Sequence, residues 1–70
     1  MKKEELTNIF TNRELEVLQY LIKGYTNKEI SEELIISEHT AKAHVCSILH
    51  KLNAKNRAIA CYLAGKYIEI

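Results

Sequence analysis

The sequence has no proline, no tryptophan and only two glycines among its 70 residues. It also lacks a strand-forming run of the kind that a β domain needs. These absences predict an all-α protein. A chain of this length makes one domain with a thin core, which argues against a desolvated catalytic cleft. It favours a module that works through its outer surface.

Long apolar runs are absent as well. No stretch reaches the roughly 18 consecutive apolar residues of a membrane span. The N-terminal residues MKKEE lack the apolar core of a signal peptide. We therefore expect a cytoplasmic, nucleoid-associated protein without a membrane partner, in which Cys46 and Cys61 are reduced thiols.

The patterns that carry catalysis or hold a metal are missing too. There is no glycine-rich phosphate loop, and no serine has an evident paired base and acid. The spacings of His44, Cys46 and His50 do not match a zinc finger or ribbon. We expect no enzyme, and no metal, cofactor or small-molecule substrate.

Two capping boxes of the form Thr-x-x-Glu, at Thr11–Glu14 and Thr26–Glu29, predict the starts of two helices. The first helix covers about 12–23 and ends where Gly24 supplies a left-handed residue. The second is short, about 27–34. Their apolar residues at helical spacing are Leu15, Leu18, Leu21 and Ile22, then Ile30 and Leu34.

Two further helices are predicted in the second half. Ser37 caps a helix over about 38–52, which Asn53 can stop in the left-handed conformation. Asn56 opens the last helix, about 57–66. The expected inward-facing residues are Ala41, Val45, Ile48, Leu49 and Leu52 in the third helix, and Ala60, Leu63, Ala64 and Tyr67 in the fourth.

The predicted architecture is a compact four-helix domain over residues 11–70, preceded by a leader over 1–10. Phe10, with Ile9 and Leu6, is expected to fold back onto the core. The second and third helices, joined by a tight turn, form a helix-turn-helix. In that motif the second of the two helices enters a DNA major groove while the first lies across the backbone.

Charge is distributed unevenly, although the net charge is only +1. Residues 37–57 contain four lysines and arginines against one glutamate, a net of +3, whereas residues 1–36 contain five against seven, a net of −2. A localised basic block is typical of a phosphate binder. On charge alone, a solvated helix face is an equally good interpretation.

Three stretches resemble the LuxR-type (FixJ or GerE type) helix-turn-helix domain: Thr11-x-Arg13-Glu14-x-Glu16-Val17-Leu18, then Gly24-x-Thr26-Asn27-Lys28-Glu29-Ile30-x-x-x-Leu34-x-Ile36-Ser37, then Thr40-Ala41-Lys42-x-His44-x-x-x-Ile48-Leu49-x-Lys51-Leu52. Asn56-Arg57, followed by Ala58 and Ala60, is similar to the start of the family's fourth helix. The resemblance covers about residues 8–68. It implies a bacterial transcription-factor domain that binds double-stranded DNA as a homodimer, weak without DNA, with RNA polymerase as a candidate further partner.

The resemblance also implies roles for single residues. The positions expected to face the bases are Lys42, Ala43 and Cys46. Those expected at the DNA backbone, including His39 from its place at the helix start, are Thr26, Asn27, Lys28, Ser37, His39, Thr40, Ser47, Lys51 and Arg57. Those expected at the dimer seam are Ala58, Cys61, Tyr62 and Gly65.

Two departures from the family pattern bear on function. Ala41 stands where valine is usual, and Cys46 where a polar or basic side chain is common. Lys42 is then the only strong reader of guanine in the first turns of its helix, which favours modest or shape-based selectivity. The alternative from another functional class is a LuxR-like protein-interaction module that pairs with another regulator without reading DNA.

Overall fold

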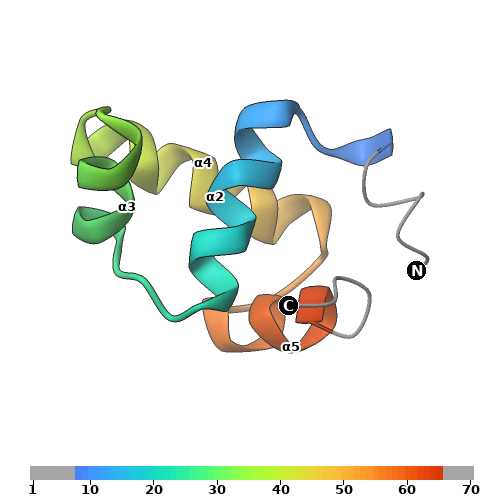
Figure 1. Cartoon of the computed structure of the whole chain (residues 1–70). Coiled ribbons are helices and arrows are strands. Elements are labelled where there is room, and N and C mark those ends of the chain that lie inside the picture. Colours follow the sequence, from blue (N-terminus) through green and yellow to red (C-terminus); the bar gives the residue numbers. More distant parts are fainter. Residues whose placement is uncertain (1–7, 66–70) are drawn as a thin grey trace.

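The computed structural model describes residues 8–65. This part of the chain contains four helices and no strand (Figure 1), which confirms the predicted all-α fold. The helices are α2 (Asn12–Ile22), α3 (Asn27–Leu34), α4 (Glu38–Lys51) and α5 (Arg57–Gly65). The predicted ends at positions 23 and 52 lie one residue beyond α2 and α4. The expected end at 66, like Leu6 and Tyr67, lies outside the described residues.

Each of the first three helices begins at a hydroxyl cap. Thr11 and Glu14 form the predicted capping box, with the Glu14 amide donating to the Thr11 hydroxyl at 3.1 Å and the Thr11 amide donating to Glu14 Oε1 at 2.9 Å. Thr26 and Glu29 repeat it at 3.1 and 2.8 Å. Ser37 accepts from the Thr40 amide at 3.0 Å. These bonds satisfy amides that have no partner inside the helix.

Three helices end in the same way, at a residue with positive φ. Gly24 follows α2 with φ 89°, and Asn53 follows α4 with φ 54°, as predicted. Ile35 follows α3 with φ 54°, which the sequence did not predict. In each case the next amide donates to a carbonyl five residues back, as Ile36 does to Ser31 at 3.0 Å. This Schellman arrangement turns the chain sharply, so α3 passes directly into α4.

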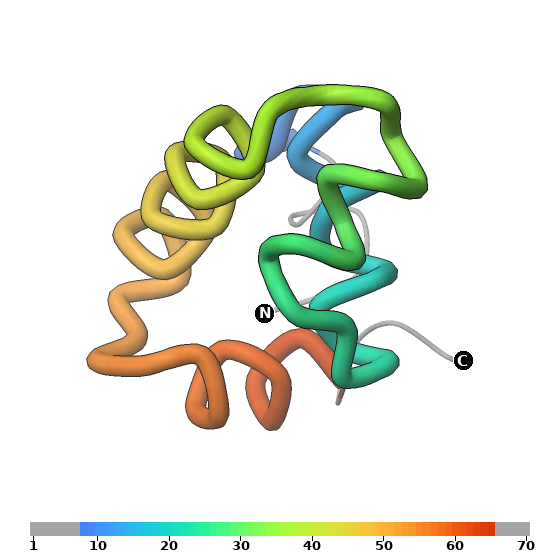
Figure 2. The backbone as a smooth tube through the Cα atoms, turned by 90° about the vertical axis from the view of Figure 1, so that its left-hand side faces the viewer, coloured from blue at the N-terminus to red at the C-terminus, as the bar shows by residue number. Residues whose placement is uncertain are grey.

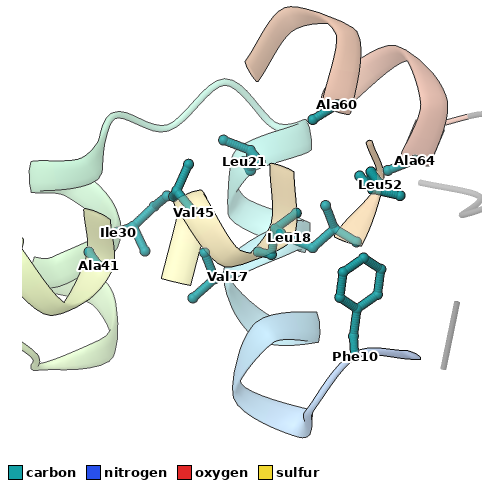
Figure 3. Close-up of a cluster of buried hydrophobic side chains, with 11 residues drawn as sticks. Phe10, Val17, Leu18, Leu21, Ile30, Ala41, Val45, Leu52, Ala60 and Ala64 are labelled. Carbon is teal, nitrogen blue, oxygen red and sulfur yellow. The ribbon is translucent and has the colours of Figure 1, made fainter. Parts of the chain in front are cut away.

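The core lies between α2 and the other helices. α2 contacts α3, α4 and α5, and α4 in turn contacts α2, α3 and α5. Figure 3 shows Leu18 in the middle of the cluster, with Phe10 packed at one end. The predicted return of Phe10 is therefore confirmed, whereas Ile9 remains 37% exposed. The buried apolar residues are Phe10, Val17, Leu18, Leu21, Ile30, Ala41, Val45, Ile48, Leu52, Ala60 and Ala64.

The packing fixes where α4 stands. Figure 2 shows α3 leading into the turn before α4, and α5 crossing below the end of α4. Since α4 buries one side against α2, α3 and α5, its opposite side is left to solvent. None of the helices within residues 8–65 is long and apolar enough to traverse a membrane.

Candidate nucleic-acid interface

The side of α4 that faces away from the core is exposed along the length of the helix. Its buried stripe, Ala41, Val45 and Ile48, faces the core. The exposed residues on the rest of the helix recur three and four positions apart and so form a continuous face. They are Glu38, His39, Lys42, Ala43, Cys46 and His50, while Lys51, which is also exposed, bonds to Glu14 of α2. The three residues predicted to face bases, Lys42, Ala43 and Cys46, all lie on this exposed face.

An open hollow lies where the starts of α3 and α4 come together. Its volume is about 320 Å³, and it is lined by Asn27, Glu38, His39 and Lys42. Two helix N-termini therefore flank a small depression that also holds a lysine. Helix N-termini attract anions through their free amides and the helix dipole.

Arg57 organises the α3 side of the hollow. Its Nη1 donates to Asn27 Oδ1 at 3.1 Å and its Nη2 donates to the Tyr25 carbonyl at 2.6 Å. The guanidinium thereby ties the first residue of α5 to the first residue of α3. Because the Asn27 oxygen is occupied, its amide nitrogen is the group left to donate to a ligand. The Thr26 hydroxyl is used in its capping box, and Lys28 is exposed.

The start of α4 is held by Ser37 and Thr40. Besides accepting from the Thr40 amide, the Ser37 hydroxyl donates to Thr40 Oγ1 at 2.8 Å. Both hydroxyls are thus committed to the cap. His39 is exposed beside them. His44, one turn further along α4, is half-buried.

Glu14 forms a polar tie between α2 and the second half of α4. It is 5% exposed, and it accepts from Ser47 Oγ at 2.6 Å and from Lys51 Nζ at 2.6 Å. Burial raises the pKa of Glu14. The bonds from Lys51, Ser47 and the Thr11 amide, together with the charge of Lys51, outweigh that effect and lower the pKa from 4.5 to about 2.

This tie gives Ser47 and Lys51 partners inside the domain. Lys51 Nζ also lies 5.9 Å from the centroid of the Phe10 ring, within cation–π range. The capping role of Glu14 was visible in the sequence, but its contacts with residues 33 and 37 positions away leave no local pattern. Sequence reasoning therefore missed that Glu14 also fixes α4.

The outer face of α5 is partly apolar. Ala58 and Gly65 are exposed, Ile59 is 39% exposed and Tyr62 is 65% exposed. Cys61 is half-buried, and its thiol donates to the Leu21 carbonyl at 3.2 Å. Three of the four residues predicted at a dimer seam are therefore exposed, whereas Cys61 is half-buried and bonds to α2. Ile59, which was not among them, joins the exposed face.

Residues 8–64 match the model of a family described as bacterial regulatory proteins, luxR family. The chain belongs to the LuxR family. This confirms the predicted resemblance, and it identifies the four helices as a LuxR-type helix-turn-helix domain, homologous to the DNA-binding domains of transcriptional regulators.

Three relatives show the breadth of the similarity. The LuxR-family chain is 51% identical over 61 residues to the uncharacterized transcriptional regulatory protein YxjL of Bacillus subtilis (strain 168). It is 43% identical over 61 residues to the nitrate/nitrite response regulator protein NarP of Escherichia coli (strain K12). It is 48% identical over 56 residues to the transcriptional regulatory protein LiaR of Bacillus subtilis (strain 168).

These matches cover most of this LuxR-family chain but a small part of each relative. The aligned segment is 87% of the chain and 28% of YxjL and of NarP, and 80% of the chain and 26% of LiaR. The chain therefore spans little more than a quarter of the length of these regulators, and the similarity concerns one domain of each.

Proposed function

We propose that this chain binds double-stranded DNA by inserting the exposed face of α4 into the major groove. The observation that carries the proposal is this face itself, with Lys42, Ala43 and Cys46 exposed on a helix whose other side is buried. It stands beside the hollow between two helix N-termini. Family membership supports the same function.

In this proposal the start of α3 positions the domain on the DNA backbone. The amide of Asn27, which Arg57 orients, and the exposed ammonium of Lys28 are the donors that approach phosphate. His39 approaches from the start of α4. Such contacts fix register and orientation. Ser47, Lys51 and Arg57, assigned to the backbone from sequence, act mainly by holding α3 and α4 in place.

Binding as a dimer through α5 belongs to the same proposal. The exposed Ala58, Ile59 and Tyr62 give this helix a partly apolar outer face. A two-fold pairing of α5 would set two α4 helices toward successive turns of the major groove. The same face supports the second candidate function, a module that pairs with another regulator without reading DNA.

The deciding experiment is fluorescence anisotropy of labelled mixed-sequence duplex titrated with the protein over a series of salt concentrations. DNA binding predicts that the logarithm of the binding constant falls linearly with the logarithm of the salt concentration, because each neutralised phosphate releases counterions. Absence of binding at low salt would favour the interaction module instead.

Lys42→Ala tests the placement of α4. We expect a loss of about 1–3 kcal/mol in binding to a selected sequence, with the fold intact because the side chain is exposed. Arg13→Ala is the matched control. It removes one positive charge from α2, outside the hollow, where Arg13 forms an ion pair with Glu16 at 3.5 Å. Equal losses for the two variants would contradict the placement.

A further inference from the structure

Glu38 is the one acidic residue that lines the hollow. It lies in the first turn of α4, where a negative charge suits the helix dipole, but no other side chain or backbone amide in the described part of the chain bonds to its carboxylate. The first-turn glutamates of α2 and α3, Glu14 and Glu29, each close a capping box. In α4 the corresponding third position is Thr40, and Ser37 caps the helix without an acidic partner. No hydrogen bond or ion pair of Glu38 occurs among residues 8–65.

Lys42 follows Glu38 by four residues, the spacing and order that favour an ion pair on a helix. Both side chains are exposed and both line the hollow, yet the ion pairs in the described residues are Arg13–Glu16 and Lys51–Glu14. The ammonium and the carboxylate thus line the same hollow without forming an ion pair with each other. Both are available to a ligand.

A carboxylate at this place is unfavourable for phosphate binding, since it repels the anion that the helix N-termini attract. The carboxylate can instead accept a hydrogen bond from a donor group of the ligand. In the major groove the amino group of cytosine is a donor that Glu accepts, while guanine offers the acceptors O6 and N7 to Lys. The Glu38 carboxylate therefore matches the cytosine amino donor of a G·C pair, and the Lys42 ammonium matches the guanine acceptors.

Taking DNA binding as proposed above, we propose that Glu38 determines sequence specificity by accepting a hydrogen bond from a cytosine amino group beside the guanine read by Lys42. Four residues of helix correspond to about 6 Å along the axis, and base pairs stack about 3.4 Å apart. The two side chains therefore read the same pair or pairs up to about two steps apart. The half-site contains a G·C or C·G pair at each of these positions.

The test is selection of bound sequences from a randomised duplex library by the wild-type protein and by Glu38→Gln and Glu38→Ala. We expect wild type to select cytosine at the Glu38 position. Glu38→Gln should change that preference toward adenine, whose N6 and N7 pair with an amide. Glu38→Ala should lose it, with about a fivefold or greater fall in discrimination against the other bases.

Glu16→Gln is the matched control. It removes the same charge from an exposed glutamate of α2 and should leave the selected motif unchanged. If all variants select the wild-type motif and differ only by a uniform change in affinity, Glu38 acts through general electrostatics and the inference is overturned. If wild type binds no DNA at all, the proposed function fails rather than this inference alone.

Discussion

At the scale of single residues, Ile35 combines a left-handed backbone with an exposed side chain. Its φ is 54° and the residue is 91% exposed. Left-handed geometry costs an L-residue roughly 1–2 kcal/mol, and the cost is greatest for a β-branched side chain. Gly24 and Asn53 end their helices with residue types that tolerate this region. Ile35 therefore retains strain that burial does not offset.

Ile35→Asn should raise the free energy of unfolding by about 1 kcal/mol, because Asn tolerates the left-handed region and little apolar burial is lost. Urea denaturation followed by circular dichroism measures the change. Gly24→Ala is the opposite control. Nothing lies within 4 Å of the added Cβ, but φ is +89°, so we expect about 1 kcal/mol of destabilisation from the backbone alone. A destabilised Ile35→Asn variant would contradict the strain argument.

Cys46 is the exposed thiol of the α4 face, whereas Cys61 is half-buried. A bulky alkyl group on Cys46 would stand between α4 and the bases in the proposed complex. Alkylation should therefore weaken DNA binding of the wild-type protein. In anisotropy titrations the Cys46→Ser variant should resist the same treatment. An unchanged affinity of the alkylated wild type would place Cys46 away from the DNA.

At the scale of helices, Glu14 has two structural roles, one within α2 and one between α2 and α4. It closes the capping box of α2, and it accepts from Ser47 and Lys51 of α4. The same carboxylate thus stabilises the start of one helix and sets the position of another. A buried carboxylate with one partner removed is costly, so loss of either bond should destabilise the packing of α4 against α2.

The lowered pKa of Glu14 makes this tie sensitive to pH. Its pKa falls from 4.5 to about 2 on folding. The stabilisation is therefore full above about pH 4.5 and is lost as the pH falls toward 2, where the folded state also takes up the proton. A pKa shift of this size is worth on the order of 3 kcal/mol.

Glu14→Gln should lose a comparable amount of stability near neutral pH and should show a weaker pH dependence below about pH 4.5. Urea denaturation at neutral pH and at about pH 3 provides both measurements. Glu16→Gln, on the exposed side of the same helix, should change stability by less than about 1 kcal/mol. Equal pH dependence of wild type and Glu14→Gln would show that other carboxylates dominate acid unfolding.

At the scale of the whole molecule, the two proposed surfaces belong to different helices. α4 presents the proposed DNA face and α5 presents the partly apolar face. Arg57, at the first position of α5, bonds to the start of α3. These bonds connect the proposed dimer surface to the proposed DNA-binding helices, a connection that binding to two spaced half-sites would use.

Ala58→Glu should separate dimerisation from DNA reading. Ala58 is exposed in the first turn of α5, where a negative charge is compatible with the helix dipole, so the fold should persist. Placed in a two-fold seam, the added charges repel each other. We expect weaker binding to a duplex with two half-sites and nearly unchanged binding to one half-site. An equal loss on both duplexes would argue against a seam at Ala58.

The sequence by itself determined the elements and the family. Capping boxes, the positive-φ positions at Gly24 and Asn53, and helical apolar spacing are local, because each depends on residues within about four positions of one another. Helix bounds predicted from them were correct within one residue for α2, α3 and α4. The family pattern then indicated which face of α4 to regard as the DNA surface.

Only the tertiary structure decided which polar side chains are committed inside the domain and which remain available. Ser47, Lys51 and Arg57 look from the sequence like DNA contacts, yet their partners are Glu14, Asn27 and the Tyr25 carbonyl. Those partners lie 30 to 37 positions away. Likewise, the sequence does not distinguish Glu38 from the other first-turn glutamates. In the folded domain, the packing of α3 against α4 places Glu38 at the hollow. Long-range packing, which no local pattern records, makes that distinction.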